Sequence, residues 1–398
     1  METCDVIVVG GGPAGATAAE HLARSGASVV LLDKAGRIKP CGGAIPPRAI
    51  RDYAIPDALI CAKVDSARMI SPSDRAVDMP IENGYVGMVD RDVFDEFLRN
   101  RAAEAGARRV KGTYLAIDRS DGQPLVRYRD ADGTEVAIKT RLVIGADGAR
   151  SAVAKQALNG SMTKSVFAYH EIIESPADGP AFDAKRCEVY YQGKLSPDFY
   201  AWVFPHGKTA SIGVGSAHKG FSLRGAVRDL RVATGLDTAV TTRTEGAPIP
   251  LKPLKKWDNG RDVVVIGDAA GVVAPASGEG IYYAMASGEM AAEEGLRALA
   301  GQPRALANIR KRFMKAHGRV FMVLGIMQWF WYANDKRRER FVTMCADPDV
   351  QQLTFEAYMN KRLVRRKPGA HLKIFLKDTA HLLRIVKPVK DGDGAAKA

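Results

Sequence analysis

The sequence predicts an α/β fold in which a parallel-sheet domain is interrupted by an antiparallel-sheet domain and followed by a helical C-terminal region. Three observations predict this arrangement. Short apolar runs that end in glycine recur at 4–10, 142–145 and 263–267, as expected of buried parallel strands. The segment 187–215 alternates apolar with polar residues, which is typical of antiparallel strands, and the chain after Ile281 has mostly helix-forming composition.

The order of these elements predicts domains made of separated segments. The first domain is expected to comprise residues 1–60, 84–160 and 255–300. The antiparallel-sheet domain is expected at 61–83 and 161–254, followed by the helical region at 301–390 and a disordered tail at 391–398. The tail is predicted from its Gly, Ala and Asp content.

The chain carries a net charge of +13, and all of the excess lies in its last quarter. Residues 301–398 hold 21 Lys or Arg against 8 Asp or Glu, whereas the preceding 300 residues hold 37 of each class. The balanced body argues against a nucleic-acid-binding protein, and the basic end favours contact with an anionic lipid surface. A solvated helical tail is the alternative explanation.

Other features of the composition indicate the compartment. No apolar run approaches the roughly 20 residues that a membrane-spanning helix needs, and the acidic residues Glu2 and Asp5 argue against a secretion signal. The five cysteines are widely spaced without a C-x-x-C pair, which indicates a reducing compartment and no cysteine metal site. We therefore expect a protein on the cytoplasmic side that associates peripherally with a membrane.

A strand, a helix and a second strand at the start of the chain form a nucleotide-binding motif. Residues 10–15, Gly-Gly-Gly-Pro-Ala-Gly, match G-x-G-x-x-G and lie between an apolar run and a helix predicted over 13–25. Gly10 allows a tight turn, Gly12 lets a pyrophosphate approach the backbone, and Gly15 lets helix and strand pack closely. The start of the predicted helix supplies positive potential for the phosphates.

Asp33 follows the strand predicted over 28–32 and lies 18 residues after Gly15. A carboxylate at this position accepts hydrogen bonds from an adenosine ribose and disfavours a 2′-phosphate. The motif is therefore expected to bind FAD or NAD and not NADP.

Two later motifs distinguish FAD from NAD. Residues 145–151, Gly-Ala-Asp-Gly-Ala-Arg-Ser, and 267–271, Gly-Asp-Ala-Ala-Gly, each follow an apolar run. Here the sequence resembles the flavin monooxygenase and reductase superfamily that shares the p-hydroxybenzoate hydroxylase fold. The resemblance implies a Rossmann-like FAD-binding domain of the p-hydroxybenzoate hydroxylase/glutathione reductase type. The resemblance implies that Asp147 lies near the pyrophosphate of FAD, that Asp268 binds the ribitol, and that Arg91 contacts the cofactor.

The helix expected to begin near Gly280 is implied to direct its positive end at the flavin and to stabilise the reduced ring. The predicted FAD-binding residues are Gly10, Gly12, Pro13, Ala14, Gly15, Asp33, Lys34, Cys41, Gly42, Gly43, Arg91, Asp147, Gly148, Gly267, Asp268, Gly278 and Gly280.

Two further motifs resemble the geranylgeranyl reductase family. One is Lys-Pro-Cys-Gly-Gly-Ala-Ile-Pro at 39–46, and the other is Tyr-Ala-Trp-Val-Phe-Pro-His-Gly at 200–207, which is similar to the family's Y-x-W-x-F-P-x-G pattern. The resemblance implies a reductase that converts a geranylgeranyl group into a phytyl group on bacteriochlorophyll, or on geranylgeranyl diphosphate. NADPH is the implied electron donor, with reduced ferredoxin as the alternative. Competing interpretations are a monooxygenase or halogenase, a quinone or prenyl-lipid reductase of the same fold, and a non-catalytic flavin carrier.

The second motif also predicts a substrate site. Alternation along a strand places Tyr200, Trp202 and Phe204 on one face, where they form an apolar wall suited to a polyprenyl chain. Cys41, Tyr200 and Trp202 are the candidate catalytic residues. The first two are candidate proton donors, with water as the alternative, and Trp202 offers an aromatic face beside the developing cation. A packing role is the alternative for Cys41, and His206 is expected in the turn after the strand. The predicted substrate-binding residues are Tyr200, Trp202, Phe204, Pro205 and Gly207.

The segment 321–333 contains one polar residue in thirteen and is followed by the basic residues 336–338. It is too short to span a bilayer but suits an interfacial position, with Trp329 and Trp331 at the lipid headgroups. A second basic run at 361–367 supports this interpretation. The alternative is that the segment closes the hydrophobic pocket of a soluble enzyme.

Overall fold

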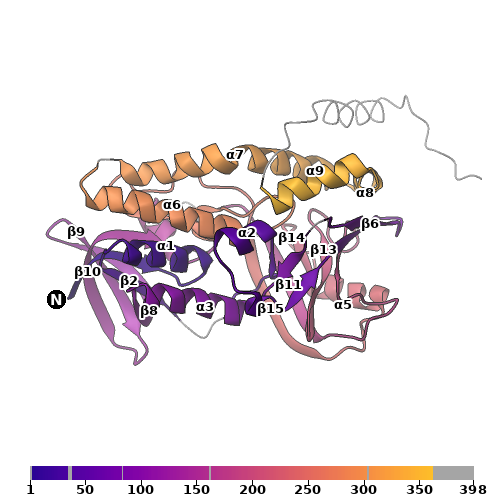
Figure 1. Cartoon of the computed structure of the whole chain (residues 1–398), viewed down its shortest axis with the longest axis horizontal. Coiled ribbons are helices and arrows are strands. Elements are labelled where there is room, and N and C mark those ends of the chain that lie inside the picture. The colour runs from indigo at the N-terminus through magenta and orange to yellow at the C-terminus, as the bar shows by residue number, and fades with distance from the viewer. Residues whose placement is uncertain (1, 35–37, 83, 161–162, 303, 362–398) are drawn as a thin grey trace, which may run out of the picture.

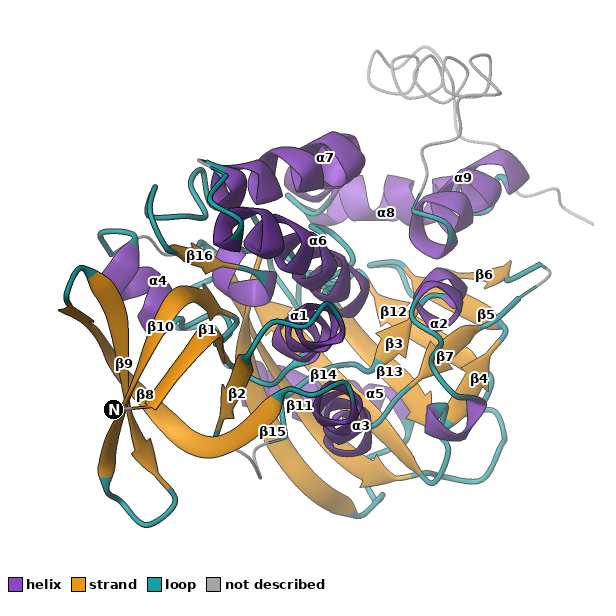
Figure 2. Cartoon of the chain, turned by 60° about the vertical axis from the view of Figure 1, so that its left-hand side comes forward, coloured by secondary structure: helices purple, strands orange, loops and turns teal. Residues whose placement is uncertain are grey.

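The computed structural model describes residues 2–34, 38–82, 84–160, 163–302 and 304–361 (Figure 1). These residues form a six-stranded sheet, a seven-stranded sheet, a small third sheet and a layer of helices. Figure 2 shows the two large sheets at opposite sides of the view.

The six-stranded sheet contains the predicted parallel strands. β1 (Glu2–Val9) lies between β2 (Val29–Asp33) and β10 (Glu135–Gly145), and all three are parallel. β8 (Arg108–Ser120) pairs with β2 and β16 (Val263–Val265) with β10, both in parallel, while β9 (Gln123–Asp130) pairs antiparallel with β8 and β10. β1, β2, β10 and β16 contain runs of buried Val, Ile or Leu, as expected of parallel strands covered on both faces.

Helices pack on this sheet and on one another. The predicted helix at 13–25 is confirmed as α1 (Pro13–Arg24), which contacts α3 (Arg91–Glu104) and α6 (Ile281–Leu299). α7 (Ala305–Trp331) packs on α6, and Figure 1 shows these two helices running along one side of the molecule. The short helix α4 (Ala152–Ala157) contacts β8 and β16.

The seven-stranded sheet has the order β15 (Thr241–Pro250), β11 (Ser165–Glu174), β14 (Thr209–Ser216), β13 (Ala201–His206), β12 (Arg186–Tyr190), β5 (Ser66–Ile70) and β6 (Ala76–Pro80). The antiparallel prediction is right for every pair but one, since β12 and β5 are parallel. A parallel pair requires a long crossover, and the chain between these two strands passes through the first sheet. Helix α5 (Leu223–Thr234) packs against β11 and β14 on one face.

A small three-stranded sheet lies beside two short helical segments. β7 (Val86–Met88) lies between β3 (Ala44–Ile45) and β4 (Ala62–Val64), next to α2 (Pro47–Asp52) and the 3-10 turn η1 (Asp57–Leu59). A second 3-10 turn, η2 (Gly267–Ala270), follows β16.

The C-terminal region continues as α8 (Asp335–Met344) and α9 (Pro348–Met359). Within the described ranges, no helix is both long enough and apolar enough to cross a bilayer. The predictions for 362–390 and for the tail at 391–398 lie outside the described residues. The strands of the six-stranded sheet fall within the segments predicted for the first domain, and those of the seven-stranded sheet fall within 61–83 and 161–254.

Candidate active site

A cleft extends from the carboxyl ends of β1 and β2 to one face of the seven-stranded sheet. Its outer part has a volume of about 640 Å³ and its inner part about 90 Å³, and both are lined by Pro13, Lys39 and Asp268. The predicted residues in the outer part are Gly10, Gly12, Pro13, Ala14, Asp33, Lys34, Asp147, Gly148 and Asp268. Those in the inner part are Pro13, Cys41, Gly42, Arg91, Trp202, Asp268, Gly278 and Gly280. Residues from all of the sequence motifs therefore meet along one cleft.

The glycine-rich turn is shaped by backbone contacts. A Cβ atom on Gly15 would lie 1.9 Å from the carbonyl oxygen of Gly10, so only glycine lets α1 start this close to β1. Gly12 has open space where its Cβ would lie, and no described side chain caps the first turn of α1. The N–H groups of that turn thus face a position that suits the pyrophosphate of a dinucleotide.

Asp33 closes the outer end of the cleft. Its Oδ2 accepts a hydrogen bond of 2.7 Å from the backbone N–H of Gly11. Arg99, which the sequence did not single out, comes from α3 to within 3.8 Å of Asp33 Oδ1 and donates to the carbonyl oxygen of Gly11. This combination of a carboxylate, a glycine turn and a neighbouring cation fits the adenosine half of FAD.

The Asp147 carboxylate forms hydrogen bonds with the first residues of helix α4. It accepts hydrogen bonds from Ser151 Oγ and from the backbone N–H groups of Ala152 and Val153, at the beginning of α4. Burial raises the pKa of Asp147 above its ordinary value despite these hydrogen bonds. The local effect is to fix the backbone of Gly148 along the cleft wall, and contact of Asp147 with the pyrophosphate stays a prediction.

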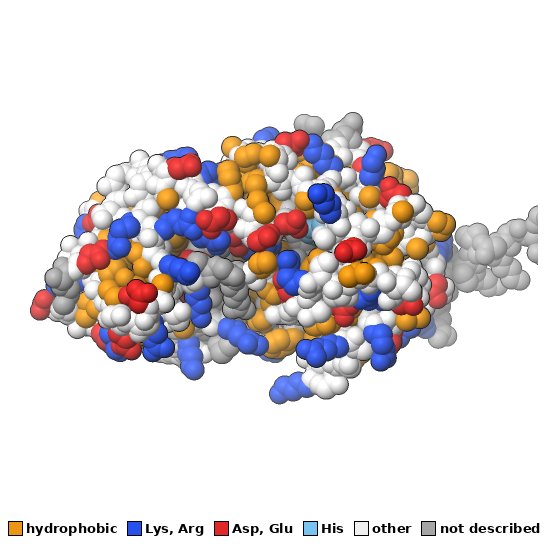
Figure 3. Space-filling view, turned by 90° about the horizontal axis from the view of Figure 1, so that it is seen from below, with side chains coloured by type: hydrophobic (Ala, Val, Ile, Leu, Met, Phe, Trp, Pro, Cys, Tyr) orange, Lys and Arg blue, Asp and Glu red, His pale blue; other side chains and the backbone are white. Residues whose placement is uncertain are grey.

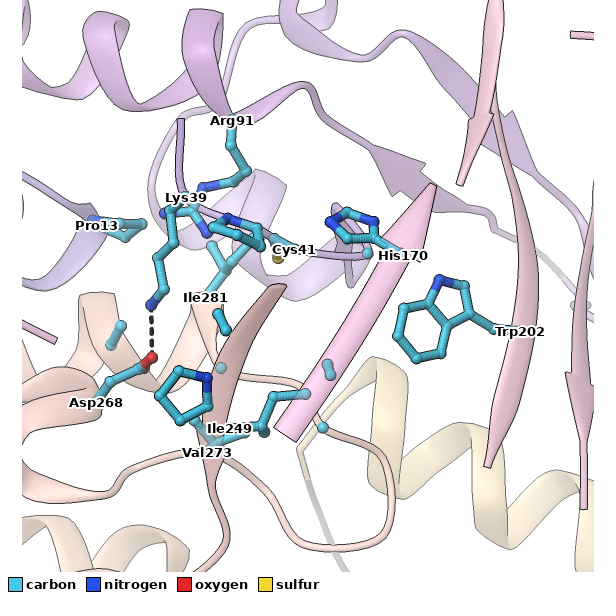
Figure 4. Close-up of a pocket in the computed structure, with 18 residues that line it drawn as sticks. Pro13, Lys39, Cys41, Arg91, His170, Trp202, Ile249, Asp268, Val273 and Ile281 are labelled. Atoms are coloured by element: carbon cyan, nitrogen blue, oxygen red, sulfur yellow. Dashed lines mark hydrogen bonds and ion pairs between the residues drawn. The ribbon is translucent and has the colours of Figure 1, made fainter. Parts of the chain in front are cut away.

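Asp268 and Lys39 mark the junction of the two parts of the cleft. Figure 4 shows Lys39 reaching across to Asp268, and the Nζ–Oδ2 distance is 2.5 Å. Asp268 lies in η2, directly after β16, which is where the ribitol prediction requires a carboxylate. The Asp268 carboxylate thus offers hydrogen-bond acceptors, and Lys39 a cation, between the outer and inner parts of the cleft.

Arg91 is a fixed charge at the inner end. Its guanidinium makes two hydrogen bonds to the buried carboxylate of Asp95, at 2.8 and 2.7 Å. Burial alone lowers the pKa of Arg91, but Asp95 and the thiol of Cys41 raise it above its ordinary value, so the side chain stays charged. Cys41 is half-buried and its Sγ accepts a hydrogen bond from the backbone N–H of Gly43.

The aromatic wall is present, but its three members differ. The rings of Tyr200 and Phe204 lie 6.0 and 6.1 Å from that of Trp202, which confirms that they share one face. Trp202 lines the inner cleft, whereas Tyr200 donates its hydroxyl to the carbonyl oxygen of Ser277 at 2.6 Å. Phe204 packs beneath Gly42.

The outer residues of this motif lie away from the cleft. Alternation along β13 turns Pro205 to the face opposite Trp202, and Gly207 occupies the turn that follows, so neither lines the cleft. Contact of Pro205 and Gly207 with the substrate stays a prediction.

The expectation that His206 lies in a turn is wrong. It is the last residue of β13 and is buried, with Nε2 3.0 Å from the carbonyl oxygen of Gly42 and Nδ1 3.2 Å from Asp90 Oδ1. A carbonyl only accepts, so Nε2 carries the hydrogen and holds the loop that bears Cys41. Cys61 donates its thiol hydrogen to the carbonyl oxygen of Met88, and its Sγ lies 3.7 Å from Nδ1, so His206, Asp90 and Cys61 form one cluster.

His170, in β11, also lines the inner cleft and was not predicted. Trp202 Nε1 donates to Ser211 Oγ at 3.1 Å, Ser211 Oγ lies 2.9 Å from His170 Nδ1, and His170 Nε2 lies 3.1 Å from Glu245. Burial raises the pKa of Glu245, but the hydrogen bond from His170 and the charge of Arg243 outweigh it, so this pKa lies below its ordinary value. An ionised Glu245 fixes the orientation of His170, then of Ser211, and finally of the Trp202 indole.

Comparison with known proteins agrees with this geometry. The family model "FAD binding domain" matches residues 3–293. Geranylgeranyl diphosphate reductase of Rhodobacter capsulatus is 58% identical over 386 residues, which are 96% of this chain and 98% of that protein. The protein of the same name from Synechocystis is 37% identical over 95% of this chain and 98% of its own length. Among solved structures, a geranylgeranyl bacteriochlorophyll reductase-like protein from Thermoplasma acidophilum matches with a TM-score of 0.78 at 23% identity, covering 93% of this chain and 100% of that one.

The structural match shows a shared fold, and the predicted architecture is confirmed as an FAD-binding α/β domain of the p-hydroxybenzoate hydroxylase type joined to a second sheet and a helical C-terminal region. The two sequence matches extend over nearly the whole chain, including both motifs on which the resemblance rests. The chain therefore belongs to the geranylgeranyl reductase family of FAD-dependent oxidoreductases.

Proposed function

We propose that this chain hydrogenates isolated double bonds of a geranylgeranyl group to give a phytyl group, on bacteriochlorophyll or on geranylgeranyl diphosphate. One observation carries the proposal: the inner end of the FAD cleft is lined by Trp202, Cys41 and Arg91 and is backed by a cluster of aromatic and aliphatic side chains. An isolated alkene has no polar group to orient it, so shape and contact area must hold it. The full-length relatives named as geranylgeranyl diphosphate reductases support the same chemistry and do not favour oxygenation or halogenation.

The residues of the inner cleft have separable tasks in this proposal. When bound and reduced by the electron donor, FAD would supply a hydride to one carbon of the double bond and return to its oxidised form. Trp202, fixed by Ser211, presents its aromatic face to the carbon that develops positive charge. Water is excluded by the packed wall, which strengthens that electrostatic contact.

Cys41 is the proton donor that the geometry favours over Tyr200. The Cys41 thiol lies on the inner cleft, whereas the Tyr200 hydroxyl is engaged with Ser277. Burial raises the pKa of Tyr200 well above its ordinary value, which makes the hydroxyl a weaker acid. In this proposal Tyr200 shapes the wall and Cys41 delivers the proton to the second carbon.

An anaerobic assay tests the reaction and its donor together. The FAD-loaded protein is incubated with geranylgeranyl-bacteriochlorophyll or with geranylgeranyl diphosphate, and product mass is followed for successive gains of two hydrogens. We propose NADPH as the donor, and dithionite or reduced ferredoxin in its place separates a failure of the donor from a failure of the reaction. Absence of any gain with all three reductants would overturn the proposal.

We further propose that α7 contacts a membrane surface. Met322, Ile326 and Trp329 are 59, 57 and 74% exposed and follow helical spacing along one face. Trp331 differs from the expectation, because it is half-buried and packs against Phe341. By contrast, the face of the body seen in Figure 3 carries Lys, Arg, Asp and Glu side chains interspersed, in keeping with the balanced charge of the first 300 residues.

Vesicle sedimentation tests the membrane contact. The triple variant M322S/I326S/W329S should lose binding to vesicles of anionic lipid while keeping FAD, because it removes apolar area at the interface. The matched control is Val232→Ser on α5, where another apolar side chain is 62% exposed. Equal binding of the triple variant and the wild type would exclude this face.

A further inference from the structure

A buried ion pair joins the C-terminal region to the cleft. Lys361 follows α9, and its Nζ lies 2.5 Å from Oε2 of Glu279; the two side chains are 1 and 3% exposed. Burying two charges costs several kcal/mol per ion unless each is well paired. The buried Lys361–Glu279 pair must therefore be stabilised by further contacts around it.

Aromatic rings enclose the ammonium group. The Lys361 Nζ lies 4.6, 5.1 and 5.5 Å from the ring centroids of Tyr358, Tyr283 and Tyr282. Tyr358 belongs to α9 and the other two belong to the first turn of α6. The cation thus holds α9 and α6 together through cation–π contacts as well as through Glu279.

The segment is anchored at a second point. Arg48 of α2 donates a hydrogen bond of 2.8 Å to the carbonyl oxygen of Asn360, the residue before Lys361. Lys361 itself adopts a positive φ of 53°, which turns the chain sharply at the end of α9. Because a residue with a side chain rarely adopts this conformation, the contacts of Lys361 must offset its cost.

Glu279 connects this pair to the cleft. It stands between Gly278 and Gly280, which both line the inner part, and its Oε1 accepts a hydrogen bond from the backbone N–H of Tyr282 in the first turn of α6. Ile281 and Ala284 of the same turn also line the inner part. Lys361, from the C-terminal region, therefore balances the charge of Glu279 at the start of α6, beside the inner part of the cleft.

We propose that Lys361 is a positioning residue that docks α9 onto the start of α6 and neutralises Glu279, so that the positive end of the helix is preserved at the inner cleft. Without Lys361, the Glu279 carboxylate would oppose the negative charge that a bound flavin gains on reduction. The proposal rests on FAD binding and not on the identity of the prenyl substrate.

The midpoint potential of the FAD-loaded full chain tests the proposal. Lys361→Met is expected to disfavour two-electron reduction about tenfold, a shift of about 30 mV to more negative potential. Glu279→Gln leaves the cation uncompensated and is expected to shift the potential the opposite way. The double variant E279Q/K361M should return to the wild-type value.

These signs separate an electrostatic role from a merely structural one. Loss of docking alone would lower the unfolding temperature in K361M and in the double variant alike, with an unshifted potential, and that result would overturn the proposal. The proposal would also be overturned if the midpoint potentials of K361M and E279Q shifted in the same direction, or if the double variant kept the shift of K361M. If K361M does not fold, the opposite shift in E279Q and its cancellation in the double variant still decide the question.

Discussion

The outer and inner parts of the cleft are built in different ways. In the outer part, the phosphate-binding turn is backbone at a strand end, and Gly10, Gly12 and Asp33 are brought together within one β-α-β unit. The inner part consists of side chains such as Arg91, Trp202 and His170, which come from elements far apart in the chain. Local geometry is therefore expected to determine how the adenosine and phosphates of FAD bind, whereas the reaction depends on how the second sheet is seated against the first domain.

The largest expected effect comes from the outer part. Gly15→Ala places a Cβ 1.9 Å from the Gly10 carbonyl oxygen, and backbone atoms cannot move away as a flexible side chain could. We expect little folded protein and no bound FAD, as measured by circular dichroism and by the flavin-to-protein absorbance ratio.

Gly12→Ala is the matched variant for this position. No protein atom lies within 4 Å of the place that the alanine methyl group would occupy, so the fold should persist. The methyl group should nevertheless block the approach of a pyrophosphate, and the dissociation constant for FAD should rise at least about tenfold. Normal FAD binding in either variant would contradict the assignment of the glycine turn.

In the inner part, a substitution is expected to lower turnover while FAD stays bound. A Cβ on Gly213, which faces Trp202 across β13 and β14, would lie 2.1 Å from the indole. Gly213→Ala should displace the ring and lower kcat/KM about 100-fold, or about 2.7 kcal/mol, without loss of FAD. Gly179→Ala, with no atom within 4 Å of its Cβ position, serves as the control. Loss of FAD together with turnover would show that the two parts are not separable.

The same contrast explains what the sequence could predict. The turn at residues 10–15 and the acid at 33 obey a spacing rule that holds wherever a strand feeds a helix, so their positions follow from the sequence. The three-residue wall at 200–204 follows from strand alternation. His170 and His206 carry no such pattern, because their partners Glu245 and Gly42 lie 75 and 164 residues away and meet them only after the sheets have paired.

Protonation of His317, which lies in α7 against the start of α6, should lower the folding stability of the protein. This residue of α7 packs against Tyr282 and Tyr283, and burial, with the nearby charges of Arg48 and Lys361, lowers its pKa to about 4. The unfolded chain binds the proton more readily, so stability falls as the pH drops below about 6.5. Between pH 7 and pH 5 the loss from this group is about 2 kcal/mol.

Denaturant unfolding at the two pH values measures this loss. In His317→Leu the difference between pH 7 and pH 5 should be smaller by that amount, because the leucine does not titrate. An unchanged pH dependence would show that His317 is not held neutral by its surroundings.

The smallest expected effect concerns the loop that joins the two parts. His206→Phe keeps a ring of similar shape but removes the hydrogen bond to the Gly42 carbonyl oxygen and the contact with Asp90, at a cost of about 1 kcal/mol. Because the loop carries Cys41 and Gly42 of the inner part and not the phosphate-binding turn, turnover should fall more than FAD affinity. A matched decrease in both quantities, measured by flavin titration and by the anaerobic assay, would instead place this loop with the outer part.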